Sequence, residues 1–312
     1  MPGEVWRKDW SLMLNRLRCY YKEMFPLPSR LMVGMIVFFE IYFIILLNYG
    51  IDRFQVSIQE FTGAFTLFSF YMYLRIADDF KDFETDRVLF PHRPLPSGRV
   101  KKEDLFLACS FFQLLTVVLN LIFMNNLPFF LFLYAYGFLM SRWFFKKHLI
   151  QNSLPLALVT HNPVQMVMNL YTVSFTCIKY DLNPFSWVTF LVLWTLYFPS
   201  LIWEVSRKIR APEDETDYTT YSKLFGYRRA TRFVLLVSWI DIITNIFLVW
   251  NLNKLTVIAL LLAISWMTRQ FLSFMDDPTR FSIGKKVEVY TLIQESLMLV
   301  TVAIYLMIGK IG

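Results

Sequence analysis

The chain has 312 residues, of which 56% are hydrophobic and 18% aromatic, and its mean hydropathy is +0.45. Soluble domains are closer to half apolar and far less aromatic, so this composition excludes an ordinary soluble protein and predicts a membrane protein. The formal net charge of +7 would suit a nucleic-acid-binding protein, but the basic residues lie between long apolar segments, which argues against that class.

The first predicted element is an interfacial helix over residues 5–25. This stretch mixes leucine, tryptophan and tyrosine with five Lys or Arg residues. A basic amphipathic helix of this kind lies in the membrane surface. We expect residues 1–30 to anchor the chain at the interface without a chemical role, as the N-terminal segment of one transmembrane domain that comprises residues 1–312.

Apolar segments of spanning length, or nearly so, occupy most of the remaining chain. Nine such segments are predicted as transmembrane helices, at residues 31–50, 59–77, 104–124, 127–141, 153–177, 185–203, 232–250, 255–274 and 288–309. The fourth is short, and only Asn125–Pro128 separates it from the third, which predicts a tight helical hairpin.

The positions of Lys and Arg predict the orientation of these spans. If the N-terminus is cytosolic, 27 of the 31 Lys and Arg residues fall at cytosolic ends, and only Arg53, Lys179, Lys254 and Lys310 fall on the other side. Cytosolic loops of membrane proteins are enriched in Lys and Arg. The sequence therefore predicts an all-α, multi-pass integral membrane protein with nine spans and a cytosolic N-terminus, and no nucleic acid partner is needed to explain the charge.

A cluster of carboxylates ends the second span. Asp78, Asp82 and Asp86 recur every four residues, so they share one face if the helix continues, and Asp79 lies beside them. Carboxylates stacked in this way repel one another unless a cation binds between them. Mg²⁺ takes such oxygen ligands and usually shares them with substrate phosphates. The cluster therefore predicts a site for Mg²⁺ and a diphosphate at the cytosolic edge of the membrane.

A proline-rich turn over residues 91–99 follows the carboxylates. It holds three prolines and one glycine, which predicts a defined turn. Guanidinium groups form forked hydrogen bonds to phosphate oxygens. We therefore expect Arg93 to contact a diphosphate, together with Arg75 and Lys81 at the end of the second span. Topological charge alone is the alternative explanation for any one of these basic residues.

A second acidic loop follows the sixth span. Its candidate metal ligands are Glu204, Asp214 and Asp217, and its candidate diphosphate-binding residues are Arg207, Lys208 and Lys223. A mixed charge run is usually a solvated loop. This one lies four helices after the first cluster and on the same predicted membrane face. We therefore expect the two acidic sets to hold two or three Mg²⁺ ions around a diphosphate, with Arg93, Arg207 and Lys208 neutralising the leaving group.

These two loops resemble the aspartate-rich motifs of the UbiA superfamily of intramembrane prenyltransferases. That family has nine transmembrane helices around a central cavity, with the motifs after helices two and six. Its first motif is Asn-Asp-x-x-Asp-x-x-x-Asp, followed by Arg-Pro-Leu-x-x-Gly. Here Asp78-Asp79-x-x-Asp82-x-x-x-Asp86 matches the motif, except that Asp78 replaces Asn, and residues 93–98 match the turn.

The second motif departs from the family pattern. The family has Asp-x-x-x-Asp, whereas here Glu204 takes the first place, Lys208 takes the second, and acidic residues recur at Asp214 and Asp217. The resemblance implies a Mg²⁺-dependent prenyltransferase. The departure leaves open a terpene cyclase of the same superfamily.

Ionisable and polar groups inside the predicted spans are further functional candidates. They are Glu40, Asp241, Arg269 and Glu295 and, in the fifth span, His161, Gln165 and Asn169. The last three are spaced by four and would line one wall of a pocket. His161 is a candidate general base, although an interhelical hydrogen bond is the commoner role for such a residue. For Asp241, an ion pair with a basic partner is the structural alternative.

The favoured function is transfer of a prenyl group from an isoprenyl diphosphate to a lipophilic, aromatic acceptor, in an active site that faces the cytosol. In the cyclase alternative, the prenyl chain captures its own cation without an acceptor. Transporters often place ion ligands near the midplane on broken helices. Here the main carboxylates lie at the cytosolic edge and the spans hold little Gly or Pro, which predicts few breaks, so an ion-coupled transporter is disfavoured. The expected partners are the two substrates and membrane lipid, with no obligate protein partner.

Overall fold

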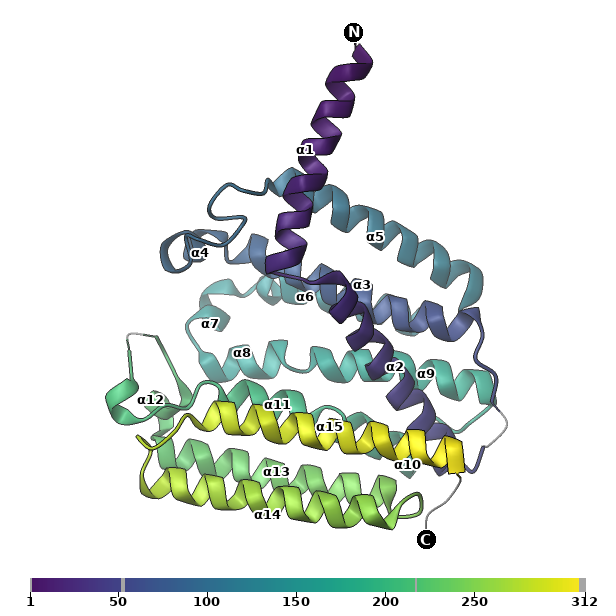
Figure 1. Ribbon diagram of the computed structural model, residues 1–312, viewed down its shortest axis with the longest axis vertical. Helices are drawn as coiled ribbons and strands as arrows, with labels where there is room; N and C mark the ends of the chain where they lie inside the picture. The colour runs from purple at the N-terminus through teal and green to yellow at the C-terminus, as the bar shows by residue number, and fades with distance from the viewer. Residues whose placement is uncertain (1, 52–53, 217, 309–312) are drawn as a thin grey trace. The chain divides into compact units, whose positions relative to one another are not determined.

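The computed structural model describes residues 2–51, 54–216 and 218–308, and side chains from residue 11 onward. The predicted metal ligand Asp217 and the cations Arg53 and Lys310 of the orientation count lie outside the described residues. Within the described ranges the protein is all-helical, as predicted, and contains no β-strand (Figure 1).

The chain divides into two compact units. Unit 1 comprises Met1–Phe39 and Gln55–Phe145, and unit 2 comprises Glu40–Phe54 and Lys146–Gly312. Helix α2 (Leu27–Asn48) contributes its first part to unit 1 and its second part to unit 2. That the whole chain forms one transmembrane domain stays a prediction.

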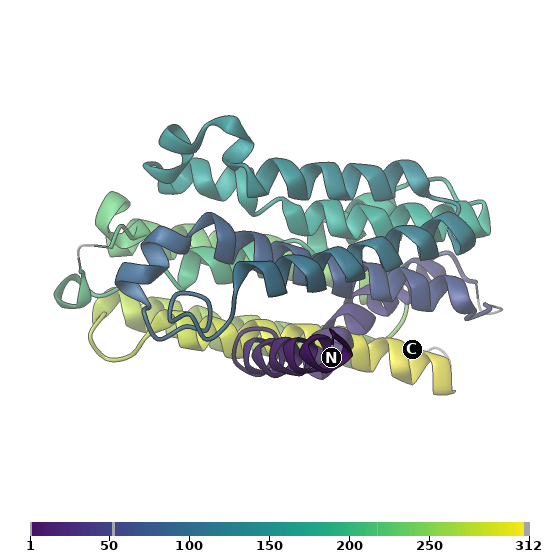
Figure 2. The same ribbon diagram turned by 90° about the horizontal axis from the view of Figure 1, so that it is seen from above.

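Unit 1 is built around the packing of two long helices. These two helices are α3 (Ile58–Lys81) and α5 (Lys102–Phe123). Besides them and the first part of α2, unit 1 contains α1 (Pro2–Glu23), α4 (Phe83–Leu89), α6 (Leu127–Ser141) and the short helix η1 (Trp143–Phe145). Helix α3 packs against α5 and α6, and α1 packs against α5. Helices α3 and α5 lie side by side in both ribbon views (Figure 1, Figure 2).

Buried polar side chains connect α3 to α5. Thr116 Oγ1 donates a hydrogen bond to Ser69 Oγ at 2.8 Å, and Asn120 Nδ2 donates to Thr66 Oγ1 at 2.8 Å. All four residues are buried. Because hydrocarbon offers no water as an alternative partner, such pairs join neighbouring membrane helices. They hold α3, and therefore the carboxylates at its end, in register with α5.

Unit 2 is a bundle of long helices with short helices at its loops. Its elements are α7 (Lys147–Gln151), α8 (Leu154–His161), α9 (Val164–Tyr180), α10 (Trp187–Thr195), α11 (Phe198–Ser206), η2 (Pro212–Asp214), α12 (Tyr221–Phe225), α13 (Tyr227–Val249), α14 (Lys254–Asp276) and α15 (Ile283–Ile308). Helix α14 packs against α13 and α15, and α11 packs against α13 and α15.

Every predicted span coincides with a helix or a broken helix, and in the part of the chain that the structure describes six candidate spans are long and apolar enough to cross a bilayer. These six are α2, α5, the α10–α11 pair, α13, α14 and α15. Helix α6 is apolar but has only 15 residues. The count of nine crossings and the cytosolic position of the N-terminus stay predictions.

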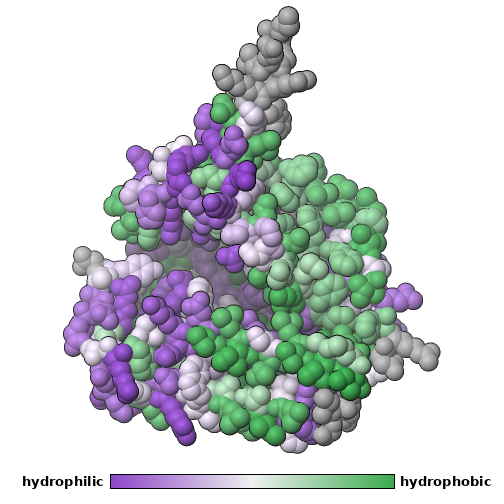
Figure 3. Space-filling view, viewed as in Figure 1, coloured by the Kyte–Doolittle hydropathy of each residue, from purple (hydrophilic) through white to green (hydrophobic). Residues whose placement is uncertain are grey.

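The surface of unit 1 follows the same division into apolar and polar regions. Hydrophobic side chains cover the face over α5, whereas hydrophilic side chains gather over α4 and the loop after it (Figure 3). Exposed side chains on α5 include Phe106, Leu114 and Ile122. A helix that exposes large apolar side chains along its length is suited to contact with lipid.

Two of the predicted spans are interrupted, contrary to the expectation of spans with few breaks. The fifth is divided between α8 and α9 at Asn162 and Pro163, and the sixth between α10 and α11, just before Pro199. Proline has no N–H for the helix ladder, and its ring clashes with the preceding turn. Asn162 Nδ2 donates to Ser200 Oγ at 3.3 Å and so links the two breaks. Because two spans are broken, helix continuity does not argue against a transporter. The position of Asp78–Asp86 at a helix end still argues against one.

The buried Asp241 has a neutral partner. Asn245 Nδ2 donates to Asp241 Oδ1 at 2.8 Å, one turn along α13. No Lys or Arg forms an ion pair with Asp241 in the described part of the chain. The ion pair considered for Asp241 from the sequence is therefore not formed.

Replacing Asn120 by Leu removes the hydrogen bond to Thr66 while keeping the branched shape and the number of side-chain heavy atoms. We expect the free energy of unfolding, measured by denaturant titration in detergent, to fall by about 0.6–1.7 kcal/mol. Leu121→Ala is the matched control, because Leu121 is exposed on the same helix, and surface changes are usually within about 0.5 kcal/mol. Equal effects of the two substitutions would contradict the role given to the polar pairs.

Candidate functional site

The first carboxylate cluster lies where α3 passes into α4. The backbone N–H of Asp82 donates to the carbonyl oxygen of Asp78 at 2.9 Å, and that of Asp86 donates to the carbonyl oxygen of Asp82 at 2.8 Å. The helical register therefore continues across the boundary between the two helices. The three aspartates follow one another at intervals of about one turn, as the sequence predicts.

Burial divides the four aspartates of this motif. Asp79 and Asp86 are only 5% and 7% exposed, whereas the side chain of Asp78 is 41% exposed. A helix turns about 100° per residue, so each four-residue step drifts by about 40°. Asp86 therefore lies within about 20° of Asp79 and about 80° from Asp78. The buried face of the motif carries Asp79 and Asp86, and not the predicted set of three residues.

Asp79 is held by two partners from different helices. Tyr20 of α1 donates its hydroxyl hydrogen to Asp79 Oδ2 at 2.5 Å, and Arg75, one turn earlier on α3, forms an ion pair with Oδ1. Asp79 lies two residues beyond the predicted span. Burial raises its pKa above the usual value and the charge of Asp86 raises it further, while Arg75 and Tyr20 act in the opposite direction. The two buried carboxylates are therefore close enough to repel one another.

Asp86 is held by Arg93. The Nη1 atom of Arg93 lies 2.8 Å from Asp86 Oδ2, and the guanidinium carbon lies 3.9 Å from the centre of the Phe90 ring. Ion pairing and stacking together fix the guanidinium plane. A guanidinium has five N–H groups, so donors remain for a second ligand.

The proline-rich turn is anchored in the hydrophobic core of unit 1. Leu95 and Val100 are buried there beside residues of α1 and α3. The backbone N–H of Val100 donates to the carbonyl oxygen of Pro94 at 3.1 Å, which closes the turn. Gly98 has φ +76°, a conformation in which a side chain is strained. The defined turn predicted from the prolines and the glycine is confirmed.

Lys81 contacts Asp78 instead of the buried pair. Its Nζ lies 2.7 Å from Asp78 Oδ1 and 4.5 Å from the centre of the Trp143 ring. Of the predicted cations in unit 1, Arg75 and Arg93 therefore contact the buried carboxylates, and Lys81 contacts the more exposed one.

The chemistry of these donors fits Mg²⁺. Among the residues that the structure describes, no three His, Cys, Asp or Glu side chains converge as a complete ligand set. Magnesium in phosphate-handling sites is usually bound by one or two carboxylates, with water and substrate phosphates at the remaining positions. Asp79 and Asp86 supply two mutually repelling carboxylates, which a divalent cation would neutralise.

In unit 2, Glu204 at the end of α11 is neutralised by its own neighbours. Arg207 Nε lies 2.7 Å from Glu204 Oε2, and Lys208 Nζ lies 2.9 Å from Oε1. Lys208 occupies the position of the second aspartate in the family pattern. It is therefore an ion-pair partner of Glu204, which occupies the position of the first aspartate. Gly284 in the first turn of α15 allows close approach here, because a Cβ would lie 3.1 Å from Arg207 Cα.

Glu215 organises the rest of the second loop, a role that the sequence does not reveal. Its carboxylate accepts hydrogen bonds from Thr220 Oγ1 at 2.8 and 2.7 Å and from Ser222 Oγ at 2.5 Å. Thr220 and Ser222 lie near several carboxylates in the sequence, and the sequence does not indicate which carboxylate accepts their hydrogen bonds. The structure therefore gives Glu215 a loop-forming role.

Two further predicted residues of this loop, Asp214 and Lys223, are exposed. Asp214 lies in η2 on the surface, and Lys223 Nζ donates to the carbonyl oxygen of Thr216 at 3.0 Å. Lys223 therefore turns back onto its own loop. Among the described members of the second set, the structure brings together Glu204, Arg207 and Lys208.

Tyr221 is a site candidate that the sequence does not single out. Its side chain is buried, and its hydroxyl has no hydrogen-bond partner among the described residues. Burial raises the pKa of Tyr221, and the nearby charge of Glu204 adds to this shift while Arg207 opposes it. A buried hydroxyl beside a charged group is usually satisfied by water or a ligand.

His161 lies at the end of α8, half-buried, with Nδ1 3.0 Å from Thr160 Oγ1. The break after α8 separates it from the other two polar residues of the fifth span. On α9, Gln165 Nε2 donates to Asn169 Oδ1 at 3.0 Å. The predicted row of three is therefore divided between two helices.

Membrane-spanning helices with buried carboxylates and arginines at a helix end define an integral membrane protein that handles a charged ligand. The family profile described as the UbiA prenyltransferase family matches residues 41–287, well over half of the chain, and both motif loops lie inside it. The chain belongs to this family of membrane prenyltransferases.

A solved structure shares this fold. It comes from work titled "Structural and mechanistic insights into the biosynthesis of Digeranylgeranylglyceryl phosphate synthase in membranes". The match has a TM-score of 0.66 and 16% sequence identity, and it covers 93% of this chain and 98% of the other. No curated protein matches the sequence significantly.

Replacing Tyr20 by Phe removes one of the two partners that stabilise the charge of Asp79. Because a hydrogen bond to a charged group contributes about 1.5–3 kcal/mol, we expect the free energy of unfolding in metal-free buffer to fall by about that amount. Tyr21→Phe is the control, since the Tyr21 hydroxyl only approaches Met72 Sδ at 3.8 Å. If the two variants unfold at the same denaturant concentration, the contact between Tyr20 and Asp79 does not stabilise the protein.

Proposed function

We propose that this protein ionises an isoprenyl diphosphate and transfers the prenyl group to a lipophilic acceptor, with Mg²⁺ as cofactor and the active site at the cytosolic side. The buried pair Asp79 and Asp86 is the observation that carries the proposal. Two buried carboxylates lie at the end of one helix, and their arginine partners are the groups that also suit a diphosphate.

The residues of unit 1 are assigned to grip the diphosphate. Asp79 and Asp86 provide carboxylate oxygens for the metal, with Asp78 and Asp82 on the more exposed side. Arg93 and Arg75 offer their remaining N–H groups to phosphate oxygens, and Lys81 adds positive charge. Bound Mg²⁺ would neutralise the diphosphate and so favour its departure.

The residues of the second loop are assigned to the same reaction. Glu204, Asp214 and Asp217 are proposed as further metal ligands, and Arg207, Lys208 and Lys223 as diphosphate contacts. Because Glu204 is paired with Arg207 and Lys208, metal binding through Glu204 requires these two cations to exchange the carboxylate for phosphate oxygens.

In the transfer reaction, the C–O bond of the diphosphate breaks and the electron pair leaves with the diphosphate. A nucleophilic carbon or oxygen of the acceptor then bonds to the allylic carbon, and the acceptor loses a proton. We assign His161 as the base for that proton. Its half-buried position next to a helix break supports this role.

A terpene cyclase is the second candidate. It is favoured by Lys208 in place of the second-motif aspartate, and by the ion pair of Lys208 with Glu204. In a cyclase the chain's own double bond attacks the allylic carbon, and a proton is lost from the resulting hydrocarbon cation.

Product analysis separates the two functions. The purified protein in lipid nanodiscs is incubated with farnesyl or geranylgeranyl diphosphate and Mg²⁺, with and without an acceptor, and the products are identified by mass spectrometry. The acceptors are aromatic phenols and, because the solved structural neighbour is a digeranylgeranylglyceryl phosphate synthase, a prenylated glyceryl phosphate. A prenylated acceptor that requires both substrates and Mg²⁺ is expected. Hydrocarbon release without an acceptor would identify the cyclase instead.

Substitutions in the first motif test the assignment of the buried pair. Asp79→Asn and Asp86→Asn are each expected to lower turnover about 10²–10³-fold, because each removes a charge that stabilises the reacting diphosphate complex. Glu84→Gln is the matched control, since Glu84 lies in the same segment with 81% of its side chain exposed. Exposed ion pairs contribute little, so its turnover should stay within about twofold. Full activity of Asp79→Asn would refute the assignment.

A further inference from the structure

Unit 1 carries a groove that the prenyl-transfer chemistry does not use. It lies between α1, the turn into α2, and α5, and has a volume of about 940 Å³. Leu14 and Leu17 of α1 line one side, and Leu107, Phe111 and Phe112 of α5 line the other. The volume is at the upper end of the range of small-molecule sites, about 300–1,000 Å³.

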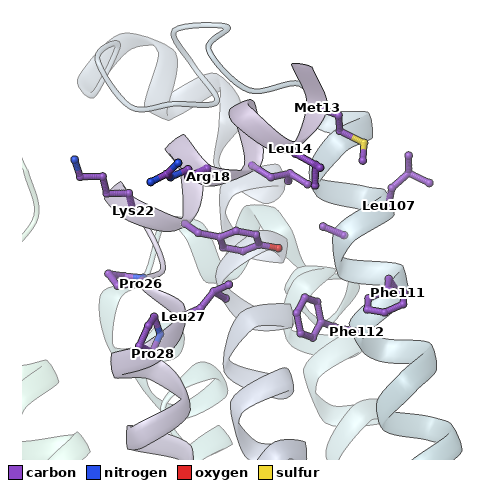
Figure 4. Close-up of a pocket in the computed structure, with 13 residues that line it drawn as sticks. Met13, Leu14, Arg18, Lys22, Pro26, Leu27, Pro28, Leu107, Phe111 and Phe112 are labelled. Carbon is purple, nitrogen blue, oxygen red and sulfur yellow. The ribbon is translucent and has the colours of Figure 1, made fainter. Parts of the chain in front are cut away.

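Two cations stand at the edge of this apolar groove. Figure 4 shows Arg18 and Lys22 on one side of the pocket and Leu107 and Phe111 on the other. Arg18 and Lys22 are four residues apart on α1, so they share a face, and both are exposed. Neither forms an ion pair or hydrogen bond with any residue that the structure describes.

Two other cations at α1, Arg16 and Arg99, are neutralised by carboxylates, unlike Arg18 and Lys22. Arg16 binds both oxygens of Asp104 at 2.6 and 2.8 Å, and Arg99 binds both oxygens of Glu23 at 2.5 and 2.8 Å. These two ion pairs also fasten α1 to the rest of unit 1. The groove is therefore preformed, and its two unpaired cations face one edge of it.

The depth of the groove suits a lipid. Helix α5 begins at Lys102, and its lining residues Leu107–Phe112 lie about 7–15 Å further along the helix axis. The hydrocarbon core of a bilayer is about 30 Å thick. With Lys102 at the membrane surface, the groove extends from the interface into the first half of that core.

We infer that this groove binds an anionic phospholipid of the surrounding leaflet, with an acyl chain along α5 and the phosphate beside Arg18 and Lys22. The charge of the two cations matches an anionic headgroup, whereas a zwitterionic headgroup carries its own positive charge. None of the described side chains that line the groove is acidic, so these residues offer no ligands for the Mg²⁺ that the diphosphate substrate brings.

Photo-crosslinking tests this inference on the full chain. The protein is reconstituted in phosphatidylcholine vesicles that contain a trace of either phosphatidylglycerol or phosphatidylcholine with a diazirine in the acyl chain, and adducts are mapped by mass spectrometry. We expect phosphatidylglycerol adducts on peptides containing residues 13–28 and 107–112. Arg18→Gln combined with Lys22→Gln should reduce them by about tenfold or more, because each cation near the surface contributes to binding of anionic lipid.

The matched control is Arg229→Gln combined with Lys285→Gln, which also removes one exposed Arg and one exposed Lys but lies in unit 2. Its adducts at the groove should equal those of the wild-type protein. Ala108→Trp fills the apolar part of the groove without a change of charge, and should also reduce the adducts. Retention of cooperative unfolding in detergent shows that each variant is folded.

Three results would overturn the inference. The first is equal labelling of the groove by the two lipids, which means that it has no preference for negative charge. The second is undiminished phosphatidylglycerol labelling in the variant of Arg18 and Lys22. The third is loss of labelling when stoichiometric geranylgeranyl diphosphate is added without Mg²⁺, which would make the groove a substrate site.

Discussion

The burial of two carboxylates, Asp79 and Asp86, is the constraint on which the candidate site in unit 1 depends. Two carboxylates buried near one another are tolerated only if other groups stabilise their charge. Arg75 and Tyr20 contact and stabilise Asp79, and Arg93 contacts and stabilises Asp86. Tyr20 comes from α1, Arg75 from α3 and Arg93 from the proline-rich turn, so three segments meet at the two carboxylates. Two carboxylates that repel one another are suited to bind a divalent cation, because the bound cation offsets the repulsion between their charges.

In the second acidic loop, the carboxylate charges are stabilised by groups that lie close to them in the sequence. Glu204 has two cations within one helical turn, Arg207 and Lys208, so its charge is satisfied without any ligand. Glu215 is likewise satisfied by hydroxyl groups of Thr220 and Ser222. The carboxylates of the first motif instead have partners from α1 and the proline-rich turn as well as from α3. The first motif also matches the family pattern more closely.

The sequence predicts the features of this protein that depend on local rules. Long apolar segments become helices because lipid leaves the backbone no other hydrogen-bonding partner, and Pro94, Pro96 and Gly98 specify a turn. Features that depend on distant segments are not predictable in this way. Tyr20 lies 59 positions before Asp79, and nothing in its own neighbourhood indicates the contact. The break at Pro163 could have been predicted from proline geometry, whereas the choice of Asp79 over Asp78 as the buried carboxylate follows only from the accumulated drift of a four-residue spacing around a helix.

Helix α1 shows how an interfacial segment acquires more than one role. Its amphipathic pattern predicts anchoring at the membrane surface, and nothing in that pattern indicates a contact with the carboxylate cluster. Leu17 and Tyr20 are three residues apart and share the buried face, where Tyr20 reaches Asp79. Arg18 is two residues from Tyr20, which places it about 200° around the helix, on the face that borders the groove. One side of α1 therefore contacts Asp79 while the other borders the groove. The ion pair between Arg16 and Asp104 fixes the rotation of α1 about its own axis. A force that draws α1 toward the bilayer surface therefore acts on the same rigid helix as the hydrogen bond between Tyr20 and Asp79.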